Sequence, residues 1–172
     1  MTGIERRNRI LQMLREQGTP LSGTALARAF GVSRQVIVQD IALIRAEDHA
    51  IISTNKGYVC RTEGTENTQP KRVFYVRHDA DHVLEEFMIV LELGGRVLDV
   101  AVEHELYGQI RADLVIENEK DAHEFIQRLD LCQDNPLMRL TGDCHYHTVA
   151  APSEKLLDLI EQELRDKGYL LE

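Results

Sequence analysis

The sequence predicts an α+β protein with an N-terminal winged helix-turn-helix over residues 1–61 and a C-terminal open-faced βαββαβα sandwich over residues 72–172. Three observations predict this organisation. Helical patterns followed by a short hairpin pattern fill the first part, whereas strand and helix patterns alternate in the second. Residues 62–71 between them are polar and lack large apolar side chains, which is typical of a linker.

The net charge of the two parts differs in sign. Residues 1–60 carry eight Lys or Arg and five Asp or Glu, a net charge of +3, whereas residues 61–172 carry twelve and twenty-four, a net charge of −12. A modestly positive module joined to an acidic one is compatible with a nucleic-acid-binding domain attached to a second domain that does not contact the phosphates.

Composition and motifs narrow the class of protein. No segment approaches the ~20 apolar residues needed to cross a bilayer, and the first ten residues lack the apolar stretch of a secretory signal, so we expect a cytoplasmic protein without membrane contact. Three irregularly spaced cysteines, Cys60, Cys132 and Cys144, favour reduced thiols over a disulfide framework. A Gly-rich phosphate loop and the GxSxG and HExxH motifs are missing, which argues against an enzyme.

The N-terminal part begins with the pattern of three helices. Residues 4–16 form an amphipathic segment that Gly18 ends. Ser22 is placed to cap a short second helix, and Gly31 supplies the turn before a third helix that Ser33 caps. Two short helices joined at a glycine are the pattern of a helix-turn-helix.

The segment "AIISTNKGYVC" predicts a wing, because two β-prone runs flank the turn Asn55-Lys56-Gly57. In such a module the second helix of the motif enters the major groove with its N-terminal residues on base edges, while nearby cations hold phosphates. The alternative is a plain polar helix face, as in some protein-interaction domains. The predicted DNA contacts are Arg28, Ser33, Arg34, Gln35, Val38, Gln39 and Lys56.

The C-terminal part shows strand and helix patterns in the order β-α-β-β-α-β-α. This order is typical of a sheet with helices on one side, of the split βαβ type. The segments in order are "RVFYVRH", "DADHVLEEFMIVLELGG", "RVLDVAVEHELYGQIRADLVI" with a turn near its middle, "NEKDAHEFIQRLDLC", "CHYHTVAAP" and "SEKLLDLIEQELRDKG".

Histidines and one carboxylate in this part form a candidate metal site. If "CHYHTV" is extended, His145 and His147 emerge on the same face of the strand. His78, His82 and Glu86 recur every four residues, as on one helical face, although His78 can instead end the preceding strand. A chemically sensible set for zinc, nickel, manganese or iron is His78, Glu86, His145 and His147. The alternative is that these side chains are a polar stripe and solvated helix residues.

Three segments, "SRQVIVQDI", "VEHELYGQI" and "HYHTVAAP", resemble the niacin-responsive transcriptional repressors of NAD biosynthesis and salvage. The C-terminal part of that family is called the 3H domain after three histidines, whose contexts match His78, His104 and the pair His145/His147. The resemblance covers nearly the whole chain. It implies a cytoplasmic homodimer that binds double-stranded operator DNA with nicotinic acid as co-repressor, and an HPr-like fold for the 3H domain.

The resemblance also implies site residues. It places a divalent transition metal on His78, Glu86, His145 and His147. It also places His104 in an adjoining ligand pocket. Apart from the resemblance, we expect Arg77 or Arg96 to pair with the carboxylate of the effector. The chain departs from the family pattern at Glu105, where a proline is usual, and at His82, where a carboxylate is usual, so the ligand set stays open at His82.

Three other functions share the same residues. A metal-sensing regulator would use the ion itself as the signal, without an organic ligand. A small metalloenzyme fused to a DNA-binding module would turn over a substrate, although a general acid or base apart from the metal ligands is not evident. A purely structural metal would hold the C-terminal part folded.

Overall fold

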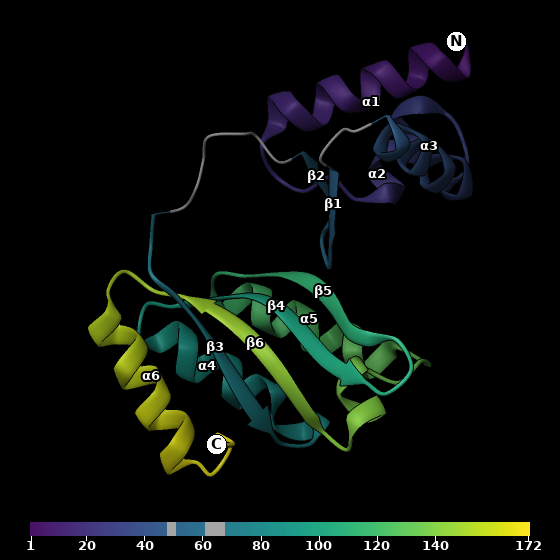
Figure 1. Cartoon of the computed structure of the whole chain (residues 1–172). Coiled ribbons are helices and arrows are strands. Elements are labelled where there is room, and N and C mark those ends of the chain that lie inside the picture. Colours follow the sequence, from purple (N-terminus) through teal and green to yellow (C-terminus); the bar gives the residue numbers. More distant parts are fainter. Residues whose placement is uncertain (48–50, 61–67) are drawn as a thin grey trace. The chain divides into compact units, whose positions relative to one another are not determined.

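The computed structural model describes residues 1–47, 51–60 and 68–172, and the chain divides into two compact units, Met1–Asn67 and Thr68–Glu172 (Figure 1). Each unit has an apolar core of its own. The predicted linker, residues 62–71, falls largely outside the described residues. Mixed helices and sheet confirm the α+β class. Over the described ranges, no helix is both long and apolar enough to span a bilayer.

The helices of the N-terminal unit begin and end where the sequence predicts. Ser22 Oγ accepts the backbone N–H of Ala25 at 3.0 Å, and Ser33 Oγ accepts that of Val36 at 3.3 Å, so both serines are N-caps. Gly31 adopts the left-handed conformation between the two helices. The helices are α1 (Gly3–Gln17), α2 (Gly23–Phe30) and α3 (Arg34–Ala46).

A buried ion pair fixes α3 against α1. The Asp40 carboxylate, on the inner face of α3, is 3% exposed. Arg6 Nε of α1 lies 2.6 Å from Asp40 Oδ2, and Arg7 Nη1 lies 3.7 Å from Oδ1. A buried carboxylate needs such a partner, so the pair specifies how the two helices meet.

The wing is the hairpin of β1 (Ile51–Thr54) and β2 (Gly57–Cys60). Its second strand is tied to the segment before α2, because Leu21 and Tyr58 exchange two backbone hydrogen bonds of 2.8 Å. Gly57 has φ +135°, and a Cβ at this position would lie 2.2 Å from the carbonyl oxygen of Leu21. Glycine is therefore required by both the backbone conformation and the close approach.

The C-terminal unit contains an antiparallel sheet in the order β5-β4-β6-β3. Because β6 pairs with β4 on one side and β3 on the other, β3 and β4 run parallel with β6 between them, which confirms the split βαβ arrangement. The strands are β3 (Lys71–Arg77), β4 (Arg96–His104), β5 (Gly108–Ile116) and β6 (Cys144–Ala150).

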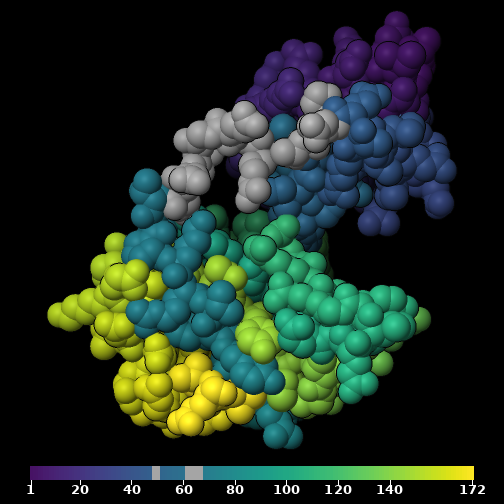
Figure 2. All heavy atoms as spheres, in the orientation of Figure 1, coloured from purple at the N-terminus to yellow at the C-terminus, as the bar shows by residue number. Residues whose placement is uncertain are grey.

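Helices cover one face of this sheet, and Figure 1 shows α4 and α5 behind the strands. The other face is open, with the rings of Tyr75 and Tyr146 stacked at 4.4 Å, and atoms of β6 are visible there between those of β3 and β5 (Figure 2). The helical segments are a 3₁₀ turn (Ala80–His82), α4 (Val83–Glu92), α5 (Glu119–Leu131), a second 3₁₀ turn (Leu137–Thr141) and α6 (Glu154–Asp166).

The C-terminal tail after α6 pairs with the outer edge of β3, which the sequence did not indicate. Leu170 forms a bridge with Val76, and the N–H of Arg77 donates to the carbonyl of Tyr169 at 2.8 Å. The tail thereby places the Tyr169 ring beside the end of β3, 5.1 Å from the imidazole of His78.

The wing geometry predicts that Gly57→Ala destabilises the N-terminal unit by more than about 2 kcal/mol. Gly31→Ala is the matched control, because Gly31 also has positive φ but a Cβ there meets nothing within 4 Å; its expected cost is about 1–2 kcal/mol. Urea unfolding and hydrogen exchange of residues 51–60 measure the difference. Equal costs for the two variants would show that the contact with Leu21 is unimportant.

Candidate metal centre and nucleic-acid interface

The two histidines of β6 point to the same face of the sheet, as predicted. Both are buried toward the helices, with His145 2% and His147 4% exposed, while the intervening Tyr146 lies on the open face. Since β6 is flanked by β3 and β4, these imidazoles lie in the middle of the sheet rather than on a surface stripe.

His78 and Glu86 reach the same place from two other elements. His78 follows the last residue of β3, and the pairing of Val76 with His145 sets it beside the start of β6. Glu86 lies on the inner face of α4 and is 2% exposed. The structure thus resolves the ambiguity of the sequence, because His78 ends a strand and Glu86 belongs to the next helix.

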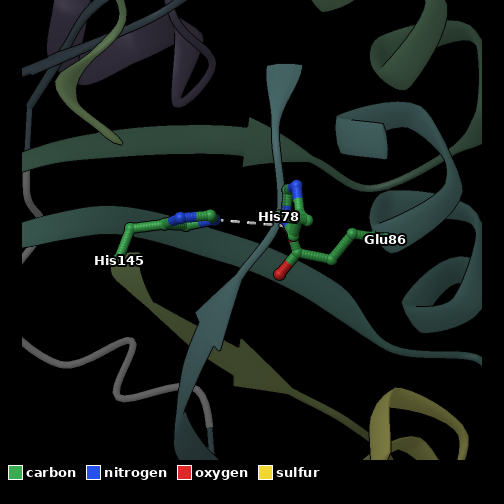
Figure 3. A group of neighbouring side chains, drawn as sticks. All are labelled: His78, Glu86 and His145. Atoms are coloured by element: carbon green, nitrogen blue, oxygen red, sulfur yellow. Dashed lines mark hydrogen bonds and ion pairs between the residues drawn. The ribbon is translucent and has the colours of Figure 1, made fainter. Parts of the chain in front are cut away.

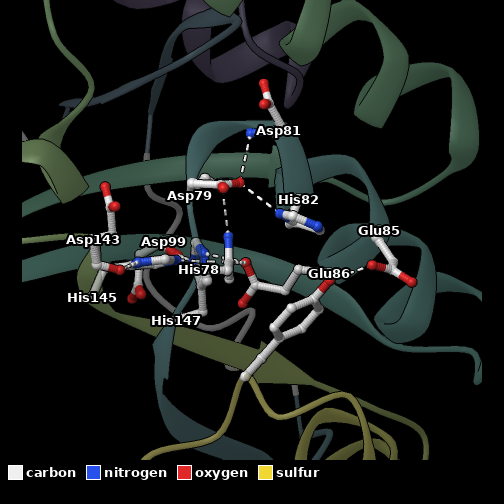
Figure 4. Close-up of polar contacts among 11 residues, drawn as sticks. His78, Asp79, Asp81, His82, Glu85, Glu86, Asp99, Asp143, His145 and His147 are labelled. Atoms are coloured by element: carbon white, nitrogen blue, oxygen red, sulfur yellow. Dashed lines mark hydrogen bonds and ion pairs between the residues drawn. The ribbon is translucent and has the colours of Figure 1, made fainter.

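The side chains converge on one carboxylate oxygen (Figures 3 and 4). Glu86 Oε2 lies 2.6 Å from His78 Nε2, 3.3 Å from His147 Nε2 and 3.5 Å from His145 Nε2. Ligand atoms of His78, Glu86 and His145 all lie within 4.8 Å of one another. Four buried polar side chains from one strand, the end of a second strand and one helix therefore face a single point.

Backbone carbonyls determine which ring nitrogen faces that point. Every imidazole in the cluster has its Nδ1 at hydrogen-bond distance from a carbonyl oxygen, which accepts an N–H but cannot donate. The Nδ1–H is therefore fixed, and the neutral ring presents the lone pair of Nε2 to Glu86. The bonds run from His78 to Asp79 at 2.9 Å, from His145 to Asp143 at 3.1 Å and from His147 to Asp99 at 2.5 Å.

Lone pairs on nitrogen facing a carboxylate oxygen repel unless a cation lies between them. The cation is either a proton on the imidazole or a metal ion shared by the ligands. Ligands at 2.0–2.1 Å from a tetrahedral zinc lie about 3.3 Å apart, which fits the distances from Glu86 to His145 and His147. The 2.6 Å between Glu86 and His78 is a direct hydrogen-bond distance and has to lengthen when an ion binds. The donor set of three imidazoles and one carboxylate suits zinc, nickel, manganese or iron.

Without a metal, protons must stabilise the cluster. Burial lowers the pKa of His78 and of His147, but the nearby charge and hydrogen bonds of Glu86 raise both pKa values overall. Burial likewise raises the pKa of Glu86, but the charge of His147 and the hydrogen bonds to the three imidazoles hold it well below its usual value. The carboxylate is therefore ionised, and the site attracts positive charge.

His82 is placed outside the cluster. Its side chain is 49% exposed, and its Nδ1 lies 2.5 Å from the Oδ1 of Asp79. Asp79 caps the 3₁₀ turn that contains His82, and α4 begins only at the next residue, Val83. His82 and Glu86 are therefore not part of one regular α-helix, and their spacing of four residues does not align them on one face. Its ring also lies 5.9 Å from that of Tyr169.

The residues predicted for the ligand pocket lie at different ends of the sheet. Arg77 pairs with Cys144 at the end of β6 that carries His145. His104, at the end of β4, accepts backbone N–H groups of the adjacent turn through Nδ1. Arg96 pairs with Ala150 at the opposite end of β6 and lies 3.3 Å from Glu117, so the structure does not bring it to the metal ligands.

Two contributors to the site were missed by the sequence analysis. Tyr169 contacts the ring of His78, and its hydroxyl donates to Glu85. Asp99 supplies the carbonyl that accepts the Nδ1–H of His147. Glycine followed by an aromatic near the C-terminus is a weak signal for the first, and a backbone carbonyl leaves no sequence signal for the second.

The predicted DNA contacts share the outer surface of the helix-turn-helix. Ile37, Ile41 and Ile44 of α3 are buried in the core together with Asp40, whereas Val38, Gln39, Ala42 and Leu43 face outward. Ser33 has a second role as the N-cap of α3, and Lys56 lies in the turn between β1 and β2, where its N–H donates to Thr54 Oγ1. The exposed predicted residues are Arg28, Ser33, Arg34, Gln35, Val38 and Gln39.

Comparison with known proteins agrees with both units. Residues 71–172 match the 3H domain family, and residues 6–59 match an HTH domain. The chain is 38% identical over 168 residues to the probable transcription repressor NiaR of Thermotoga maritima, which covers 98% of this chain and 94% of that protein. It is 35% identical over 172 residues to the transcription repressor NadR of Bacillus subtilis, which covers 99% and 96%.

The proton-stabilised cluster predicts a pH optimum for the stability of the metal-free protein. The contribution of Glu86 is present above pH 4.5 and is lost as the pH falls through its lowered pKa. The contribution of His78 and His147 is present below pH 6.5 and is lost as the pH rises through their raised pKa values.

Urea midpoints of protein in EDTA should therefore fall as the pH rises above 6.5. Adding Zn²⁺ or Ni²⁺ should remove this fall, because the ion replaces the protons. Glu86→Gln is the control, because it removes the negative charge of the side chain without changing the size of the side chain. A metal-free midpoint that is flat above pH 6.5 would contradict the proton-bridged arrangement.

Proposed function

We propose that this chain, which belongs to the 3H-domain family of transcription repressors, represses genes of NAD biosynthesis and niacin salvage with nicotinic acid as co-repressor. The similarity to transcription repressors and the HTH domain indicate that the chain binds double-stranded DNA and is a regulator rather than an enzyme. In the proposal, the protein acts as a cytoplasmic homodimer, and the effector is sensed at a metal ion in the C-terminal unit.

The observation that carries the proposal is the convergence of three Nε2 lone pairs on one buried carboxylate oxygen. Such a set is stable with a cation and unfavourable without one. The ligands would be His78, Glu86, His145 and His147, and an ion that accepts five or six ligands, such as nickel, manganese or iron, would keep positions for a small ligand. When bound, the ion supplies a Lewis acid that the ring nitrogen or the carboxylate of nicotinic acid can ligate.

Residues of the chain supply the rest of the ligand site in this proposal. Arg77, the last residue of β3, is exposed on the open face at the His145 end of the sheet, so in this proposal its long side chain reaches around the strand end to pair with a carboxylate. His104 lies on β4 at the turn that leads into β5. Tyr169 covers the His78 side with an aromatic ring. These groups favour a small, planar, anionic ligand.

Repression requires the effector to bind one arrangement of the dimer better than another. In a dimer the two α3 helices must meet half-sites about one helical turn, ~34 Å, apart. A coupling of ~1–3 kcal/mol between effector and DNA changes operator affinity by ~5- to 150-fold. The coupling is reciprocal, so operator DNA should tighten nicotinic acid binding by the same factor.

A gel-shift experiment on the promoter of a niacin salvage gene tests this function. The protein is prepared with measured metal content, and nicotinate is titrated with and without added metal. An increase in operator affinity that needs both components supports the proposal. A full response to metal without nicotinate indicates a metal sensor, and loss of C-terminal structure on chelation indicates a structural ion; either outcome overturns the co-repressor role.

Replacing both strand histidines should abolish the effector response. The variant His145→Ala/His147→Ala loses two metal ligands, so we expect nicotinate to change its operator affinity by less than about twofold, compared with ~5- to 150-fold for the unmodified protein. Basal DNA binding should persist because α3 lies in the other unit. His123→Ala, an exposed histidine on α5, is the control and should respond normally.

The DNA interface gives a separate prediction. Arg34→Ala removes an exposed cation from the first turn of α3, and we expect a loss of about 1–3 kcal/mol in specific operator binding. Arg15→Ala, an exposed cation at the end of α1, serves as the control for a general change in charge. Equal effects of the two variants in gel shifts at several salt concentrations would argue against α3 as the recognition helix.

A further inference from the structure

We propose that Asp99 is a positioning residue that holds His147 in the orientation in which it binds the metal. This inference rests on the proposed function, because it concerns the same metal site. Asp99 does not face the metal ligands directly. It acts through a local irregularity of β4 that turns its own carbonyl toward the ring of His147 (Figure 4).

The irregularity is a β-bulge opposite His147. Between the pair Val97 and Val149 and the pair Ala101 and Tyr146, β4 has three residues where β6 has two. The extra residue on β4 interrupts the regular ladder at this point. A backbone carbonyl that would otherwise face the neighbouring strand becomes available for a side chain.

Asp99 repairs the ladder with its side chain. The carboxylate Oδ1 accepts the backbone N–H of Thr148 at 2.8 Å, in the place of a backbone carbonyl. The Oδ2 lies 2.7 Å from Nη2 of Arg111 on β5, an ion pair that compensates the charge of a residue that is 2% exposed. The same residue thus closes the gap in the ladder on one side and offers its carbonyl to His147 on the other.

His147 depends on this arrangement more than its two companions do. The carbonyls that accept Nδ1–H from His78 and His145 belong to Asp79 and Asp143, one and two residues away in the chain. The carbonyl for His147 comes from Asp99, 48 residues away on the adjacent strand. Its ring orientation is therefore set by the register of β4 against β6, which the bond from Asp99 to Thr148 holds.

This geometry predicts which side chains can replace Asp99. Asparagine has the same size, and its amide oxygen can accept the N–H of Thr148. Its NH2 group cannot accept from Arg111, but the exposed Arg111 side chain can turn to solvent, so the bulge and the carbonyl stay in place. Alanine leaves the buried N–H of Thr148 without its acceptor, so the strands should shift to recover a hydrogen bond. The shift withdraws the carbonyl from His147 and frees its ring.

Metal affinity of the full-length protein is the first measurement. We expect Asp99→Ala to bind Zn²⁺ or Ni²⁺ about 10- to 100-fold more weakly than the unmodified protein, and Asp99→Asn to stay within about threefold of it. Asp113→Ala is the matched control, because Asp113 pairs with Asp99 across the sheet and lies 3.5 Å from Arg111 but is not bonded to Thr148 or His147. It should bind normally.

Two further readouts separate positioning from a general loss of structure. In the His147→Ala background, Asp99→Ala should weaken metal binding no further, because the residue acts through that imidazole. The visible spectrum of the Co²⁺-loaded Asp99→Ala variant should resemble that of His147→Ala, and Asp99→Asn should restore the original bands.

The outcomes distinguish this inference from the proposed function. Failure of the unmodified protein to bind any of these metals overturns the metal site itself. If the unmodified protein binds metal and Asp99→Ala binds equally well with an unchanged spectrum, the metal site stands and the positioning role is wrong. A loss of affinity of tenfold or more in Asp99→Asn also overturns it, and this isosteric variant decides the question even if Asp99→Ala does not fold.

Discussion

The C-terminal unit is organised around one constraint, which is that three imidazoles with fixed Nδ1–H groups direct their Nε2 lone pairs at the same buried carboxylate oxygen. Opposed lone pairs in a site shielded from water cost free energy until a cation is shared between them. The strand order answers this constraint. Because β6 lies between β3 and β4, His145 and His147 lie beside the end of β3. Glu86 faces them from the inner side of α4.

Local sequence signals predicted the elements well because they act over a few residues. Ser22 and Ser33 are caps, and the alternation in "CHYHTV" fixes the shared face of His145 and His147, whatever the rest of the chain does. The i, i+4 spacing of His78, His82 and Glu86 was ambiguous for the same reason. A strand end, a 3₁₀ turn and a helix share that stretch, so equal spacing does not give a common face.

The parts that could not be predicted are those that depend on pairing between distant segments. Arg96 and Arg77 were equivalent candidates in the sequence, yet strand register sends them to opposite ends of β6. The ion pair of Arg6 with Asp40 joins residues 34 apart in the chain and requires the helix packing to be known first. The carbonyl of Asp99 depends on a bulge, and a bulge is a property of two strands rather than of one sequence.

The apolar core of the C-terminal unit helps to distinguish a structural role of the metal from a ligand-binding role. Structural zinc ions typically hold together domains too small to bury an apolar core, and such domains unfold without the ion. Here Phe87, Ile116, Leu157 and Ile160 are fully buried in an extensive core that spans the sheet and three helices. Because most of this packing does not involve the four ligands, we expect the unit to fold without the ion. A site preformed by its scaffold would fit the proposed function, in which occupancy by a ligand, rather than folding, is the signal.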